Sequence, residues 1–224
     1  MRCYAGANFF ALKAAAPACR RDGAVMCNLY TQSKSPDEIA RIFREQQMAL
    51  RFPEGIPNLQ PRDIRITEPG PIVRAAPGAD GGFDLIVRRW SWPGPGGKPV
   101  YNFRSDGREF SSGRCLIVAD GFYEFTTPVD PAQKRKDRWL FSKPHGELIG
   151  IAGLVRDAAE HGEAFTMLTT EPGPDVAPYH GRQVALLRPD QWWPWLTYAR
   201  PACELLGPAS AGTLDVSAAN AAAA

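Results

Sequence analysis

Short apolar runs bounded by turn residues are the feature that most constrains the fold of this chain. After residue 83 they follow one another as DLIVRRWSW, RCLIVADGFYEF, RWLFSK, LIGIAGLV, AFTMLTT and QVALL. Each has the length of a strand and carries β-branched or aromatic residues. From Pro53 to Gly82, prolines and glycines are too frequent for a long helix, and loop with short strands is expected. The chain is therefore predicted to be mainly β.

Two short helices are expected beside the strands. Residues 35–38, SPDE, form a capping box with proline at the first helical position. They precede apolar residues at helical spacing, namely Ile39, Ile42 and Phe43. The segment RPDQWWPWL is predicted to start a second helix at Pro189, which Pro194 disturbs. Together with the strand-like runs, this pattern predicts an α+β fold dominated by strands.

The composition fits one folded domain in a reducing compartment. The chain has 224 residues, 44% apolar and 22% charged, with a formal charge of +2 that permits an anionic partner without requiring one. Five cysteines without a C-x-x-C pair argue against a disulfide framework or a zinc knuckle. No apolar stretch approaches the roughly 20 residues of a membrane span, and no P-loop, G-x-G-x-x-G or H-E-x-x-H motif is present. We therefore expect a cytoplasmic monomer with no membrane segment, metal or cofactor.

The two ends of the sequence differ in composition from its middle. Residues 1–25 are alanine-rich, and Asn8 and Lys13 interrupt their apolar run, so they make a poor secretory signal. They are expected to be a disordered extension, or sequence upstream of the start codon that the cell uses. Residues 208–224 contain few bulky apolar side chains and are expected to form a flexible tail. The folded domain is predicted to span residues 26–207.

An internal methionine stands directly before a cysteine in the stretch AVMCNLYTQS. Translation from Met26 and removal of that methionine would leave Cys27 at the amino terminus. Its α-amine and thiol, with reference pKa values of roughly 8 and 8.5, would then both be available near neutral pH. Such a pair can capture one aldehyde twice, first as an imine and then as a five-membered thiazolidine. An internal cysteine cannot do this, and taken alone Cys27 is more ordinarily a buried core residue.

Several motifs, in order, resemble those of the SRAP family, the SOS response-associated peptidases. They are MCNLY followed by a capped helix, YNFRSDGREF, RCLIVADGFYEF, GIAGLV and LTTEPGPDVAPYHGRQVALL, between Met26 and Leu196. The resemblance implies a single barrel-like domain of mainly antiparallel strands. It also implies an enzyme that crosslinks to abasic sites in single-stranded DNA, with AP-lyase and autopeptidase activity as further expectations.

The same resemblance assigns four catalytic residues, which are Cys27, Asn102, Glu124 and His180. Cys27 would be the nucleophile once Met26 is lost. Glu124 would take a proton from the α-amine, and His180 would donate one to the sugar ring oxygen or the departing hydroxyl. Asn102 would hold the amino-terminal residue through neutral hydrogen bonds.

Contacts with DNA are implied for a second set of residues, which are Arg104, Arg62, Trp90, Trp92 and Arg182. Arginine suits phosphate through its planar fork of donors. The tryptophans would stack on an unpaired base or wedge beside the lesion, although an ordinary place in the β core is an equal alternative for both.

Three positions depart from the family pattern. Leu29 stands where an arginine is common, Asp63 where an asparagine is expected, and Asp106 where a glutamate is usual. An acidic Asp63 near a phosphate would be unfavourable. These departures affect substrate preference and crosslinking rate more than the core reaction.

Two other functions remain open at this point. An autopeptidase would use the Cys27 thiol with His180 to remove residues 1–26. A nucleic-acid-binding module without catalysis would bind single-stranded DNA in a salt-sensitive way and form no covalent product.

Overall fold

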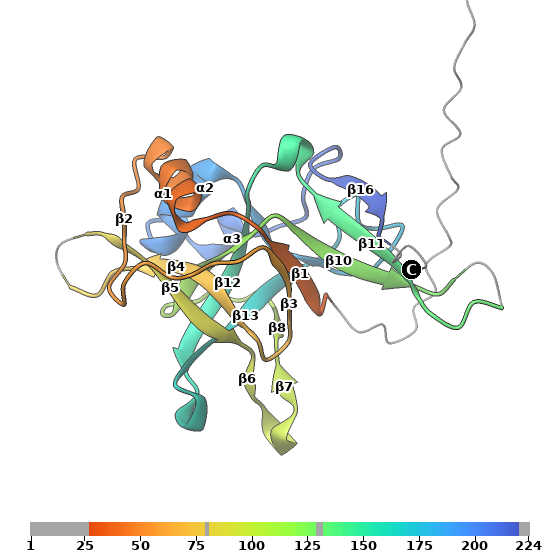
Figure 1. Ribbon diagram of the computed structural model, residues 1–224, viewed down its shortest axis with the longest axis horizontal. Helices are drawn as coiled ribbons and strands as arrows, with labels where there is room; N and C mark the ends of the chain where they lie inside the picture. The colour runs from red at the N-terminus through yellow and green to blue at the C-terminus, as the bar shows by residue number, and fades with distance from the viewer. Residues whose placement is uncertain (1–26, 79–80, 129–131, 220–224) are drawn as a thin grey trace, which may run out of the picture.

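Five strands close into a barrel at the centre of the structure, a computed structural model that describes residues 27–78, 81–128 and 132–219 (Figure 1). In order around the barrel they are β4 (Pro69–Ala75), β5 (Phe83–Trp90), β13 (Glu163–Thr170), β12 (Ile149–Asp157) and β9 (Arg114–Ala119). The barrel closes where β13 runs parallel to β5, and its other pairings are antiparallel. The predicted mainly antiparallel, barrel-like α+β domain is confirmed.

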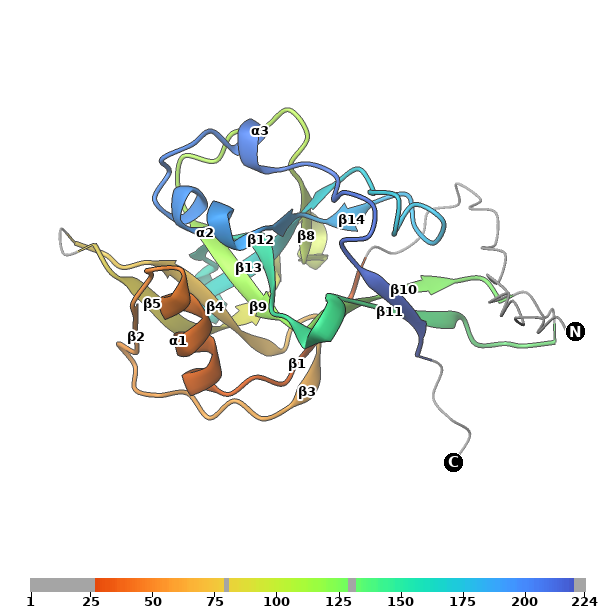
Figure 2. The ribbon, with the colours of Figure 1, turned by 90° about the horizontal axis from the view of Figure 1, so that it is seen from above.

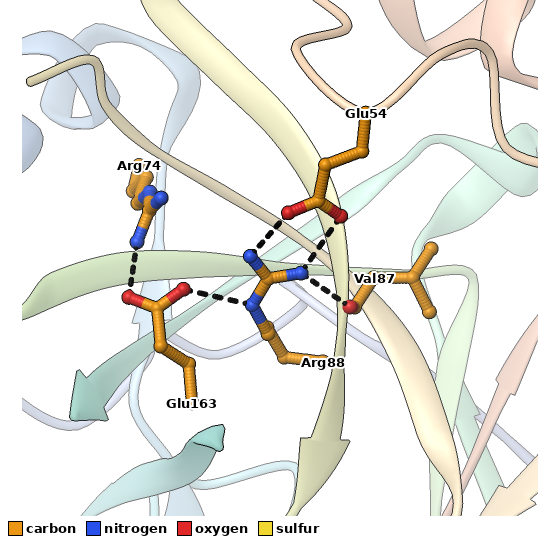
Figure 3. Close-up of polar contacts among 5 residues, drawn as sticks. All are labelled: Glu54, Arg74, Val87, Arg88 and Glu163. Carbon is orange, nitrogen blue, oxygen red and sulfur yellow. Dashed lines mark hydrogen bonds and ion pairs between the residues drawn. The ribbon is translucent and has the colours of Figure 1, made fainter. Parts of the chain in front are cut away.

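An ion-pair network spans the parallel junction between β5 and β13 (Figure 3). Glu163, at the start of β13, accepts from Arg74 of β4 and from Nε of Arg88 of β5, the latter at 2.9 Å. The other side of the Arg88 guanidinium binds both carboxylate oxygens of Glu54, which lies in the loop after β2 (Leu50–Arg51). The network therefore connects three strands and one loop at the point where the barrel closes.

A second sheet lies beside the barrel. Its strands pair antiparallel in the order β16 (Asp215–Ala218), β11 (Asp137–Ser142), β10 (Gly121–Thr126), β1 (Leu29–Gln32) and β3 (Arg62–Arg65). β10 and β11 form a hairpin that projects away from the barrel (Figure 2). Since β9 leads almost directly into β10, one continuous stretch of chain joins the barrel to the second sheet.

Short elements complete the described fold. The short strands are β2, β6 (Trp92–Pro93), β7 (Pro99–Val100), β8 (Asn102–Arg104), β14 (Gln183–Val184) and β15 (Leu186–Leu187). The α-helices are α1 (Pro36–Glu45), α2 (Pro189–Leu196) and α3 (Ala202–Leu205), and single 3₁₀ turns occur at η1 (Pro95–Gly97), η2 (Pro144–Gly146) and η3 (Ala159–His161). No helix of the described residues is long and apolar enough to span a membrane.

Both predicted helices form where the sequence places them. The Ser35 side chain accepts from the Glu38 backbone N–H, and Glu38 bonds back to Ser35, so the capping box at the start of α1 is complete. Pro194 lies inside α2 without ending it. The indole N–H of Trp195 donates to the Cys115 carbonyl at 2.9 Å, and the ring is fully buried. Anchoring of this kind outweighs the one helical hydrogen bond that a proline removes.

The barrel strands are buried on both faces, which explains their continuous apolar runs. Every residue of β9 is buried. Cys115 and Ile117 point to the cluster inside the barrel, whereas Leu116 and Val118 belong to the cluster that packs against α1 and α2. A strand covered on both faces loses the alternation of apolar and polar residues.

The predicted flexible tail is wrong for residues 208–219. β16 pairs with β11 through Phe141–Val216 and neighbouring pairs. The Asp175 carboxylate also accepts from the backbone N–H groups of Gly212 and Leu214, at 2.9 and 3.0 Å. An edge strand is held mainly by backbone hydrogen bonds, so the scarcity of bulky side chains misleads here. The predicted extension over residues 1–25 and the last five residues lie outside the described part of the chain.

Candidate active site around Cys27

Cys27 lies two residues before the start of β1 and is held by Asn102. β8 runs parallel to β13, with Asn102 opposite Met167, and this pairing brings the amide to the start of β1. Its Nδ2 donates to the Cys27 carbonyl oxygen at 2.9 Å. The cysteine has no exposed surface, and its Sγ lies 3.4 Å from the Leu29 carbonyl oxygen. Residues 75 positions apart in the sequence are thus in direct contact.

Glu124 lies beside Cys27 on the neighbouring strand. β10 pairs with β1 through Tyr30–Phe122, and two further residues along β10 reach Glu124. Its side chain is fully buried, and this burial raises the pKa of the carboxyl well above its ordinary value, with the nearby Cys27 backbone N–H acting in the opposite direction. Burial also raises the pKa of the Cys27 thiol, and the Glu124 charge adds to that rise. Both groups are therefore held toward their neutral forms.

His180 lies on the turn between β13 and β14, next to the same sheet. Tyr179 packs on Trp139 with ring centroids 4.8 Å apart, and Trp139 is the residue opposite Glu124 on β11. Nδ1 of His180 lies within hydrogen-bond distance of both the Arg182 backbone nitrogen, at 3.0 Å, and the Arg182 carbonyl oxygen, at 2.9 Å, whereas Nε2 has no partner within the described structure. The contacts recorded for the buried His180 are with residues of its own turn, not with Cys27 or Glu124.

Three of these four residues have buried polar atoms that form no hydrogen bond within the described structure. They are both carboxylate oxygens of Glu124, Oδ1 of Asn102 and Nε2 of His180. Buried polar groups are nearly always hydrogen-bonded, and leaving one unpaired costs about 1–3 kcal/mol. Such a concentration of unpaired atoms is typical of a site that a bound molecule completes.

Tyr101 is a member of this site that the sequence analysis missed. It is half-buried, and its pKa is raised first by burial and then by the charges of Cys27 and Glu124. Its carbonyl accepts from the Trp90 indole at 2.9 Å, and the two rings meet edge to face at 6.2 Å. The only sequence signal for Tyr101 was its position next to Asn102 in YNFRSD. Its place near Cys27 and Glu124 depends on how β8 pairs with β13, which the sequence does not show.

Arg104 and Arg182 converge on Thr169. Arg104 is exposed and pairs with Thr169 across β8 and β13, while Nη2 of Arg182 donates to the Thr169 carbonyl at 2.8 Å. Arg182 also forms a 2.6 Å ion pair with Asp106, one of the positions that depart from the family pattern. Because Arg182 is half-buried and paired with Asp106, Arg104 is the more accessible of the two arginines.

Arg62 lies apart from Cys27. It is opposite Gln32 at the far end of the β1–β3 pairing and binds Glu68 and the Pro69 carbonyl. The arginine opposite Leu29, and so closer to Cys27 along the pairing, is the exposed Arg65, which the sequence analysis did not select.

The two tryptophans expected to touch DNA are core residues. Trp90 has no exposed surface and belongs to the cluster inside the barrel. Trp92 is 5% exposed, packs with Ala158 and Ala164, and lies under the Arg156 guanidinium at 4.2 Å. Side chains buried in this way present no face to a base, so the expected stacking is corrected to the β-core alternative.

The carboxylate of Asp63 already has two partners within the protein. The Tyr123 hydroxyl donates to its carboxylate at 3.0 Å, and Arg138 pairs with it at 3.7 Å. Arg138 also stacks over the Tyr123 ring at 4.7 Å. The unfavourable effect expected of this carboxylate on a phosphate is reduced by these two partners.

The side chains of Cys27 and Glu124 have no exposed surface, so the site is closed to solvent. Two cavities of about 210 and 260 Å³ flank residues 206–208, and neither is lined by Cys27, Asn102, Glu124 or His180. In the part of the chain that the structure describes, no group of three or more His, Cys, Asp or Glu residues could hold a metal ion. Because Cys27 has no exposed surface, a substrate can reach it only if the site opens.

Comparisons with known proteins identify a family and a fold. The family model described as SOS response associated peptidase (SRAP) matches residues 98–221, which include Asn102, Glu124 and His180 but not Cys27. No curated protein sequence matches the chain.

Three crystal structures have a similar fold. A protein from Bordetella bronchiseptica has a TM-score of 0.61 at 22% identity, over 87% of this chain and 100% of its own. A protein from Bacteroides thetaiotaomicron has 0.65 at 16% identity, over 86% and 91%. A phage-related protein from Bordetella bronchiseptica has 0.65 at 20% identity, over 87% and 94%. These similarities extend the common fold to most of the chain.

Proposed function

The chain belongs to the SRAP family, which indicates a function associated with DNA damage, and from this premise we propose that it crosslinks to abasic sites in single-stranded DNA through Cys27. The observation that carries the proposal is the set of unpaired buried atoms on Asn102, Glu124 and His180. An aldehyde and its hydroxyl groups can use such donors and acceptors, which the folded chain leaves unsatisfied.

The reaction begins with the free α-amine of Cys27 and the aldehyde of the opened sugar. The nitrogen attacks the aldehyde carbon, and the resulting carbinolamine loses water to form an imine. The thiol sulfur then adds to the same carbon while its proton passes to the nitrogen, which closes a thiazolidine. The overall change forms one C–N and one C–S bond and releases one water molecule.

The surrounding residues have separate roles in this sequence. A Glu124 carboxyl whose pKa burial raises well above its ordinary value suits the transfer of protons to and from the amine. Nε2 of His180, which has no partner within the described structure, is the ring nitrogen available to exchange a proton with the sugar oxygen. Asn102 fixes the Cys27 carbonyl by the 2.9 Å hydrogen bond already described. Tyr101 keeps its proton, because burial and neighbouring negative charge raise its pKa.

The alternatives are supported less well. An autopeptidase needs a thiolate activated by a histidine, yet burial raises the pKa of Cys27, and the recorded contacts of His180 are elsewhere. A DNA-binding module without catalysis does not require the unpaired buried atoms of Asn102, Glu124 and His180, which lower the stability of the fold.

The direct test compares three oligonucleotides with a chain whose amino terminus is verified as Cys27 by mass. One contains an abasic site, one an intact base, and one a tetrahydrofuran analogue that has no aldehyde. A heat-stable adduct is expected with the first alone. Absence of that adduct, or equal yields with the analogue, would overturn the proposal.

Asp106→Asn is expected to strengthen binding of single-stranded DNA by about threefold, the size of effect typical of a partly exposed ion pair. Removing the carboxylate frees Arg182 and removes a negative charge near the path proposed for phosphates. Fluorescence anisotropy at several salt concentrations measures the change. The matched control is Asp190→Asn, which removes an exposed carboxylate from an ion pair with Arg188 on α2. Weaker binding by Asp106→Asn would mean that this carboxylate positions Arg182 instead of masking it.

A further inference from the structure

We propose that Lys134, Arg135 and Lys136, here called the cationic loop, form a second contact surface for single-stranded DNA and bind phosphates that flank the lesion. The cationic loop lies between β10 and β11 and ends directly before Asp137, the first residue of β11. This inference rests on the proposed function, because it takes Cys27 as the point where the lesion is held.

The cationic loop carries three adjacent positive charges on exposed side chains. Within the described residues, none of the three forms an ion pair with a carboxylate. Several arginines elsewhere in the fold do form such pairs, namely Arg41–Glu45, Arg51–Asp84, Arg88–Glu54 and Arg182–Asp106. The nearest carboxylate in sequence, Asp137, already accepts from the Gln133 side chain at 2.8 Å. The charges of the loop are therefore available to an external anion.

The register of the second sheet places the cationic loop next to the candidate site. Glu124 is two residues from the end of β10, where Thr126 pairs with Asp137 at the start of β11. Two residues of strand span about 7 Å, and Lys136 follows directly across the hairpin. Cys27 lies beside the same half of β10, and Figure 2 shows the hairpin projecting from the rest of the fold.

The position of the cationic loop favours a role in binding single-stranded nucleic acid over a role as a solvent-exposed surface without a ligand. A strand held at Cys27 must continue past the site in both directions, and its phosphates repeat at short intervals. Lysine and arginine contacts to phosphates require no particular base, which suits a lesion that has lost its base. The neighbouring Arg138 is already paired with Asp63 and stacked on Tyr123, so it stabilises the base of the hairpin.

The test removes the three charges together, as Lys134→Ala, Arg135→Ala and Lys136→Ala, and measures binding and crosslinking. For an abasic oligonucleotide of about 20 nucleotides, the affinity at low salt should fall about tenfold, and the slope of log K against log salt should fall by about 2. Crosslinking to an abasic dinucleotide should be unchanged, because its single phosphate lies at the lesion itself and it has no flanking phosphates for the loop to bind.

A control variant removes three charges elsewhere, as Arg41→Ala, Arg44→Ala and Arg200→Ala, and should keep the wild-type salt slope. An unchanged slope in the loop variant, or an equal change in the control, would overturn the inference. A loss of equal size on intact duplex DNA would contradict the assignment to a single strand. If the wild-type chain binds but crosslinks neither oligonucleotide, the proposed function fails, whereas the salt slopes still decide the role of the loop.

Discussion

Glu124→Gln is expected to slow adduct formation by about 10²- to 10⁴-fold, the usual contribution of a positioned acid or base. Glutamine has nearly the same shape, but it cannot exchange a proton with the amine. Single-turnover rates with an abasic oligonucleotide over a pH series measure the loss. Glu45→Gln on α1, which removes one exposed carboxylate, should keep the wild-type rate.

The same substitution is expected to stabilise the fold near neutral pH. Burial raises the pKa of Glu124 above its ordinary value of 4.5, so the folded state binds more protons than the unfolded state over the range above that value. The unfolding free energy of the wild-type chain therefore falls as pH rises through this range. Glutamine has no such dependence, so the stability difference should shrink as the pH is lowered to about 4.5.

Denaturant titrations at several pH values test this expectation. A variant that unfolds with the same pH dependence as the wild type would mean that Glu124 does not carry a raised pKa. An unchanged crosslinking rate would remove it from the reaction. The two results separate the burial of the carboxyl from its catalytic use. A gain in stability together with a loss of rate is the pattern expected where a folded chain retains unsatisfied groups for a substrate.

Local sequence signals predicted the elements whose formation depends on neighbouring residues. The capping box at Ser35 needs only Glu38, three positions away, and α1 starts where it predicts. The strand-like runs likewise became β5, β9, β12 and β13. The course of α2 through Pro194 and the strand at the end of the domain depend instead on distant partners. Trp195 anchors α2 through the Cys115 carbonyl, and β16 is held by β11.

The candidate site was predictable only as far as the family resemblance extended. In the structure Asn102 bonds to Cys27 and Glu124 lies beside it, although they are far apart in the sequence. Tyr101 could not be found, because its place depends on the parallel pairing of β8 with β13, which no local pattern encodes. For a related reason, the sequence left Trp90 open between a DNA contact and the β core. An aromatic residue in a strand can face the core or the solvent, and the closure of the barrel decides which.

A chain that keeps residues 1–26 is expected to form no heat-stable adduct. In that chain the Cys27 nitrogen is an amide, which cannot condense with an aldehyde, and the thiol has no exposed surface. A chain that starts at Met26 and loses it has a free amine at the same position. The comparison uses both chains, with their amino termini verified by mass, and one abasic oligonucleotide. Equal adduct yields with residues 1–26 still attached would show that an internal thiol suffices.

Variants of the shorter chain identify which nucleophile forms the stable bond. Cys27→Ala should leave the amine and form a reversible imine, which promotes strand cleavage and can be trapped by borohydride, but should give no heat-stable adduct without a reductant. Cys27→Ser should behave similarly, because an oxazolidine opens more readily than a thiazolidine. A stable adduct from either variant would mean that the sulfur does not close the ring. If only the shorter wild-type chain gives the adduct, the amine and the thiol of one residue are both required, and the free amino terminus at Cys27 is what makes this protein reactive.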